Sequence, residues 1–98
     1  MNKEDMPEDL QKRLDKMNEI YEKLSQAIRG ENGSSQSLKG LVRSFRKDFE
    51  FNKSNEYKQI WAMLFTLESE IMQSNWETAT TLMSSIYENV LSLFNIRM

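Results

Sequence analysis

The sequence predicts an all-α protein, a small four-helix bundle of up-down type with three long helices and one shorter helix. In four stretches, apolar residues recur alternately three and four positions apart, which places them on one side of a helix. With 98 residues, 39% of them hydrophobic, the chain is expected to form a single domain, 1–98, around one core. The four stripes are Leu10, Leu14, Met17, Tyr21, Leu24 and Ile28; Leu38, Leu41 or Val42, Phe45 and Phe49; Tyr57, Ile60, Leu64, Leu67 and Ile71; and Trp76, Ala79, Met83, Ile86, Val90 and Leu93.

The first helix is predicted to run from about Pro7 to Arg29. Proline suits the first helical position because its missing N–H would have no partner there. Glu8 and Asp9 lie next to the positive end of the helix dipole, where carboxylates are favoured. Gly30 is a typical residue just beyond the end of a helix.

The segment 30–37 is rich in glycine and serine and predicts a flexible linker between the first two helices. The second helix is the shorter one and is predicted from about Ser37 to Phe49. Ser37 or Ser35 is expected to cap it, because a serine side chain can accept a hydrogen bond from a free backbone N–H. Gly40 weakens its first turn.

The third helix, from residue 54 or 55 to 72, and the fourth, 75–95, have wide apolar arcs. Extra apolar residues such as Trp61 and Phe65 extend the third arc to about 200°, and the fourth spans about 180°. We expect either that these two helices form the centre of the bundle or that part of the arc is a surface for a dimer or another partner.

A tight connection is predicted between the third and fourth helices. Ser74 and Glu77 have the spacing of a capping box, in which the serine caps forward and the glutamate reaches back. The two helices should therefore pack antiparallel.

Composition excludes most catalytic chemistry. The chain has no Cys and no His, so thiolate catalysis, disulfides and the commonest general base and metal ligand are missing. There is no Gly-rich phosphate loop and no Asp-x-Asp pattern. We therefore expect no enzymatic activity, no metal site and no cofactor.

The same reading predicts a cytoplasmic or nuclear protein. Residues 1–10 are charged and lack the apolar region of a signal peptide. No uncharged apolar run approaches the ~20 residues of a transmembrane segment.

Glu68 falls within the apolar arc of the third helix. A buried carboxylate needs a partner or must stay protonated. Glu68 is expected either to lie at the edge of the helix seam and reach water, or to pair with an Arg or Lys from the second helix or from another chain.

Four cations share one face of the second helix, opposite its apolar stripe: Lys39, Arg43, Arg46 and Lys47. Such a face is either solvated and paired with neighbouring acidic groups, or it binds an acidic partner, phosphates or anionic lipid. Four cations are few for a nucleic-acid protein, and a pI of about 5.2 argues against one.

We therefore predict a noncatalytic protein–protein interaction module, such as an adaptor, inhibitor or assembly factor, that binds through a helical surface. One alternative is a nucleic-acid-associated regulator that uses the basic face. Another is a structural homodimer formed through the third and fourth helices. The predicted partner-binding residues are Lys39, Arg43, Arg46, Lys47, Trp61, Phe65 and Glu68.

Two pieces of the chain resemble the C-terminal helical domain shared by the steroid receptor RNA activator protein and the COPII outer-coat subunit. The resemblance implies a small helical bundle that serves as a protein-interaction module, and it assigns no binding residue. The first piece is Lys12-Arg13-Leu14 with Met17, Ile20 and Tyr21, and the second is Trp76, Ala79, Leu82 and Ile86.

Overall fold

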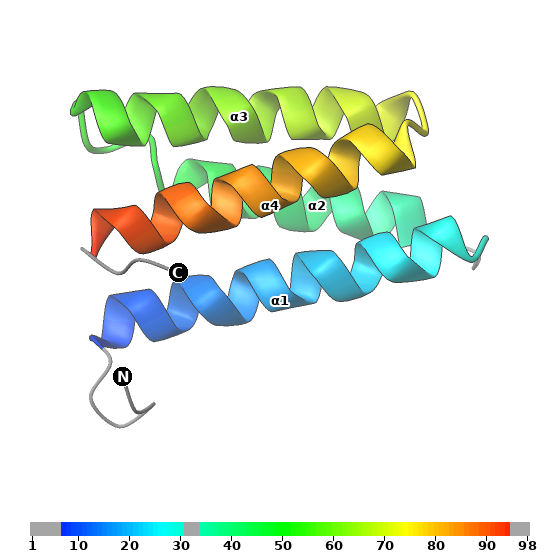
Figure 1. Ribbon diagram of the computed structural model, residues 1–98, viewed down its shortest axis with the longest axis horizontal. Helices are drawn as coiled ribbons and strands as arrows, with labels where there is room; N and C mark the ends of the chain where they lie inside the picture. Colours follow the sequence, from blue (N-terminus) through cyan, green and yellow to red (C-terminus); the bar gives the residue numbers. More distant parts are fainter. Residues whose placement is uncertain (1–6, 31–33, 95–98) are drawn as a thin grey trace.

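The computed structural model describes residues 7–30 and 34–94, and within these ranges it forms four helices and no strand. The helices are α1 (Glu8–Ile28), α2 (Ser34–Lys47), α3 (Asn55–Met72) and α4 (Trp76–Leu93). They pack in a ring in chain order: α1 on α2, α2 on α3, α3 on α4, and α4 back on α1 (Figure 1). The predicted all-α four-helix bundle is confirmed. None of these helices has the length and apolarity needed to cross a bilayer.

The core lies along the axis of the ring and takes large side chains from every helix. Met17 of α1, Phe45 of α2, Leu64 of α3 and Met83 of α4 are all fully buried. Burying each such side chain contributes about 1.5–3 kcal/mol relative to leaving it exposed. Of the two predicted core residues on α2, Val42 is fully buried and Leu41 is half-buried. Because all four helices share the core, α3 and α4 do not form its centre.

Helix α2 begins earlier than the sequence predicts. It starts at Ser34 and ends at Lys47, so Ser35 and Ser37 lie inside the helix and not at its cap position. Of the predicted linker 30–37, residues 34–37 are helical and residues 31–33 lie outside the described residues. Burial of Leu38 against the core outweighs the low helix propensity of Gly40.

At the start of α1, Pro7 occupies the cap position rather than the first helical position, with an extended backbone (φ −54°, ψ 142°). Gly30 follows the helix in the left-handed region, at φ 78°, as expected of a glycine terminator. The predicted start of α3 is confirmed: Ser54 is its cap, and its Oγ accepts a hydrogen bond from the backbone N–H of Tyr57 at 3.4 Å.

The capping box predicted for the α3–α4 connection is wrong. Ser74 lies in the left-handed region, at φ 59°. Its N–H donates to the carbonyl of Ile71 at 3.0 Å, and the N–H of Asn75 donates to that of Glu70 at 2.9 Å. These two bonds form a Schellman turn that ends α3, so Ser74 closes one helix and Asn75 takes the cap position of the next. The connection is nevertheless tight, and α3 and α4 pack antiparallel as predicted (Figure 1).

Polar contacts attach α1 to its neighbours at the edges of the core. The guanidinium of Arg13 lies 4.8 Å from the ring centre of Phe49 and donates a hydrogen bond to the hydroxyl of Tyr57. Lys16 pairs with Asp48, just after α2, at 2.9 Å. These contacts hold the α2–α3 connection against α1.

Candidate interaction surface between α2 and α3

Glu68 of α3 pairs with two arginines of α2. Its Oε1 accepts from Nε and Nη2 of Arg43 at 3.2 and 2.6 Å, and its Oε2 accepts from Nη1 of Arg46 at 2.9 Å. The two arginines are three residues apart and therefore lie on the same face of α2, so both reach one carboxylate. Glu68 is only 7% exposed. Of the two predicted alternatives for Glu68, the structure therefore shows the ion pair, and both partners belong to the same chain.

Arg46 is also enclosed by aromatic rings. Its guanidinium carbon lies 5.4 Å from the ring centre of Trp61 and 5.2 Å from that of Phe65. The two rings stack on each other, with centres 5.7 Å apart and planes 18° apart. The side chain of Arg46 is 16% exposed, and its buried Nε has no hydrogen-bond partner among the described residues. Arg46 therefore joins α2 to α3 and supports the aromatic pair from below.

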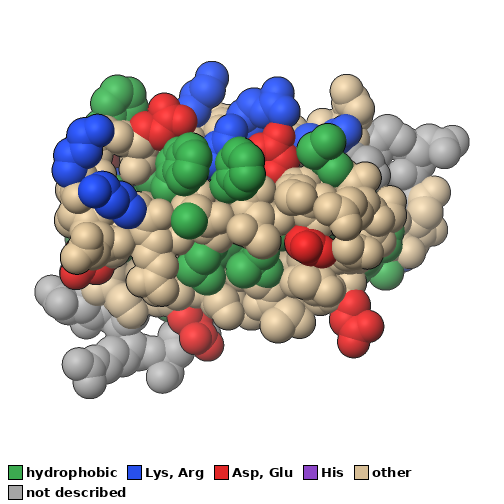
Figure 2. Space-filling model, turned by 90° about the horizontal axis from the view of Figure 1, so that it is seen from above, with side chains coloured by type: hydrophobic (Ala, Val, Ile, Leu, Met, Phe, Trp, Pro, Cys, Tyr) green, Lys and Arg blue, Asp and Glu red, His purple; other side chains and the backbone are tan. Residues whose placement is uncertain are grey.

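Two large apolar side chains of α3 face solvent beside this cluster. Phe65 is 55% exposed and Met72 is 65% exposed. Figure 2 looks onto α3, the uppermost helix of Figure 1, and shows hydrophobic side chains on this face with Lys and Arg along one side. Phe65 and Met72 border a depression of about 360 Å³, which we call the Met72 hollow. Its lining is Arg43, Arg46, Phe65, Glu68, Ser69 and Met72.

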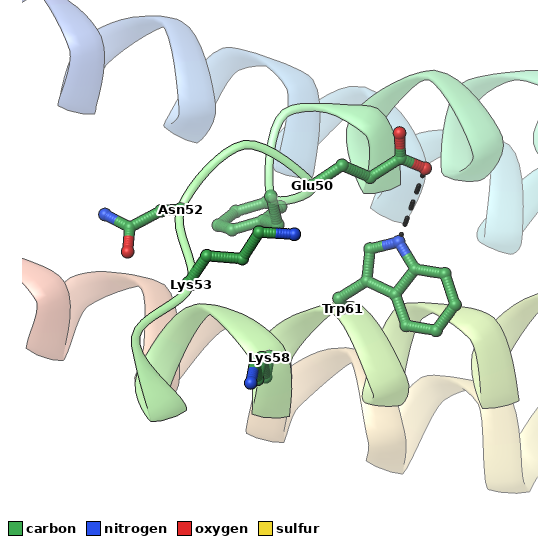
Figure 3. A pocket seen from close by; sticks show the side chains of 6 residues that line it. Glu50, Asn52, Lys53, Lys58 and Trp61 are labelled. Carbon is green, nitrogen blue, oxygen red and sulfur yellow. Dashed lines mark hydrogen bonds between the residues drawn. The ribbon is translucent and has the colours of Figure 1, made fainter.

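A second depression of about 220 Å³, the Lys58 hollow, lies at the other end of the face (Figure 3). The side chain of Lys53 extends toward the indole of Trp61, whose Nε1 donates a long hydrogen bond to Glu50 at 3.4 Å. The stacked rings of Trp61 and Phe65 separate the two hollows, since each hollow takes one of the rings as a wall. The lining is Phe49, Glu50, Asn52, Lys53, Lys58 and Trp61.

Five of the seven residues predicted to bind a partner are brought together: Arg43, Arg46, Trp61, Phe65 and Glu68. The other two predicted residues, both lysines, lie one turn before and after Arg43 on the same face of α2, where one is half-exposed and the other exposed. We call these seven residues, together with the two hollows, the α2–α3 surface.

Sequence reasoning did not select Met72 or the two lysines of the Lys58 hollow. Met72 follows Glu68 by one helical turn, so its position in the apolar arc was a usable signal. Lys58 precedes Trp61 by three residues on α3, so the same helical spacing was a usable signal for it. Lys53 gave no such signal, because its position beside Trp61 depends on the path of the α2–α3 connection.

The α2–α3 surface offers guanidinium and ammonium groups, aromatic faces and a thioether, which can form ion pairs, hydrogen bonds and apolar contacts. Within 7–30 and 34–94, no three acidic side chains gather into a group that could hold a metal ion. Comparison of the chain with known protein families, with curated proteins and with solved structures found no match. The resemblance to the coat-subunit helical domain stays a prediction.

Proposed function

We propose that the protein is a noncatalytic interaction module that binds another protein through the α2–α3 surface. The observation that carries this proposal is the pair of large apolar side chains, Phe65 and Met72, that face solvent next to a row of cations. Aromatic residues, Met and Arg are the types enriched at protein interfaces, and truncating a central one commonly costs more than 1 kcal/mol of binding free energy.

The contacts beneath this surface favour binding because they hold it in place before a partner arrives. Arg46 is fixed between Glu68 and the stacked rings, so Phe65 is supported from below. Arg43 points Nε and Nη2 at Glu68 while 60% of its side chain faces water, which leaves part of the guanidinium open to an acceptor. A side chain that is already ordered loses less conformational entropy on binding.

The test is affinity capture from the native source by the full chain, with quantitative mass spectrometry. The informative variant is Phe65→Ser with Met72→Ser, which removes the apolar contacts and leaves the Glu68 ion pairs intact. Ile28→Ser is the matched control, because Ile28 is an equally exposed apolar residue (54%) at the end of α1, outside the surface. Charge reversal at Arg46 is unsuitable, since it would place a second carboxylate against Glu68.

We expect wild type and the Ile28 variant to capture the same proteins, and the double variant to lose them by at least about tenfold. Equal capture by all three would refute the proposal. So would recovery of nucleic acid in place of protein, or a dimer of the chain itself that the double variant dissociates.

A further inference from the structure

Helix α3 carries a second stripe in addition to the one that faces the core. Lys58, Trp61, Phe65, Glu68 and Met72 follow one another at intervals of three, four, three and four residues. This is the spacing of a coiled-coil seam, and it places all five side chains within a narrow arc of the helix. The stripe runs over residues 58–72, and its first and last Cα atoms are about 21 Å apart along the helix.

A coiled-coil seam is buried against another helix along its whole length, whereas the second stripe is buried only in part. Glu68 is covered by α2, whereas Phe65 and Met72 face solvent. The Lys58 and Met72 hollows lie at either end of the stripe, with the stacked rings between them. In a helical bundle such a position is filled by one more helix, whose side chains enter hollows between those of the seam.

The charges beside the stripe select the kind of helix. On α2, Lys39, Arg43 and Lys47 repeat every four residues, so they form a row about 6 Å apart along one face of the helix. Arg43 in the middle of this row lines the Met72 hollow, and Lys47 at its end is exposed. Lys58 adds a cation at the start of the stripe. A second copy of this face would bring like charges together, whereas carboxylates at four-residue intervals would meet the row.

From the seam, the hollows and the cation row we infer that the α2–α3 surface receives an acidic amphipathic helix of a partner protein. Apolar side chains seven residues apart, about 10.5 Å, enter the two hollows on either side of the stacked rings. Glutamates or aspartates on one flank of that helix pair with Lys39, Arg43 and Lys47. This inference rests on the proposed function and specifies the partner of the same surface.

The probes are three synthetic helical peptides of about five turns. The first has leucines at the coiled-coil spacing with glutamates on the flank, the second has lysines in place of the glutamates, and the third has the first composition in scrambled order. Binding to the full chain is measured by calorimetry, and the site is located by NMR from the methyl group of Met72 and the ring of Phe65. Binding to phosphatidylserine vesicles is measured separately, to test whether the surface binds an anionic membrane instead.

We expect the glutamate peptide to bind at least about tenfold more tightly than the other two and to shift the signals of Phe65 and Met72. In the Lys39→Glu, Lys47→Glu variant this preference should reverse toward the lysine peptide. Equal binding of the first two peptides, binding that leaves both signals unmoved, or a response to vesicles alone would overturn the inference.

The two proposals fail in different ways. In one outcome, the Phe65→Ser, Met72→Ser variant loses the native partners, the Lys39→Glu, Lys47→Glu variant keeps them, and the glutamate peptide does not compete with them. That outcome refutes only the acidic helix. If the Phe65 and Met72 variant still captures every partner, the surface itself is refuted.

Discussion

Replacement of Glu68 by glutamine tests whether the buried carboxylate joins α2 to α3 mainly through Arg46. Glutamine keeps the size of the side chain and one acceptor oxygen but removes the charge. Arg46, with 16% of its side chain exposed, would then keep a charged guanidinium without its carboxylate. Arg43 is 60% exposed and can turn to water instead. A hydrogen bond to a charged group contributes about 1.5–3 kcal/mol, whereas an exposed ion pair contributes about 0–1 kcal/mol.

We therefore expect Glu68→Gln to lower the free energy of unfolding by about 2 kcal/mol. For a domain of this size, that loss corresponds to a fall in Tm of about 10 °C. The measurement is urea unfolding followed by far-UV circular dichroism, and an unchanged dependence on urea would show that the folded and unfolded states keep their compactness.

Double-mutant cycles separate the two arginines. Combining Glu68→Gln with Arg46→Met should give a coupling energy of about 2 kcal/mol, and combining it with Arg43→Met should give less than about 1 kcal/mol. Removing both Glu68 and Arg46 should cost little more than removing either, because no unpaired charge is then left behind. Equal coupling energies for the two arginines, or a Glu68→Gln variant as stable as wild type, would refute this reasoning.

Three further substitutions test the backbone conformation and use the same unfolding measurement. Gly40→Ala should raise the free energy of unfolding by about 0.5–1 kcal/mol, because the added methyl group lies in open space on a helix. Gly30→Ala should lower the free energy of unfolding, because φ is 78° there and alanine is strained in that conformation. Loss of stability at position 40 would contradict the helix geometry described for α2. Ser74→Gly should raise the free energy of unfolding by about 0.5–1 kcal/mol, because glycine adopts the left-handed conformation at φ 59° without strain. A decrease in the free energy of unfolding would argue against the Schellman turn.

Much of the candidate site was predictable from the helical period, because that period determines which residues share a face. It placed Trp61 and Phe65 outside the core stripe of α3, and it placed Arg43 and Arg46 together on α2. It did not show that Arg46 would lie beneath the aromatic rings. A helical wheel describes one helix alone, whereas that contact requires the relative height of α2 and α3.

The sequence by itself determined the four helices and most of their core-facing positions, since these depend on neighbours within one or two helical turns. Only the tertiary structure decided three other features. Ser74 ends α3 rather than capping α4, because the chain must reverse there through a left-handed residue. Glu68 finds its partners on α2, and Met72 stays exposed, because the packing of the helices decides which part of a wide apolar arc is covered.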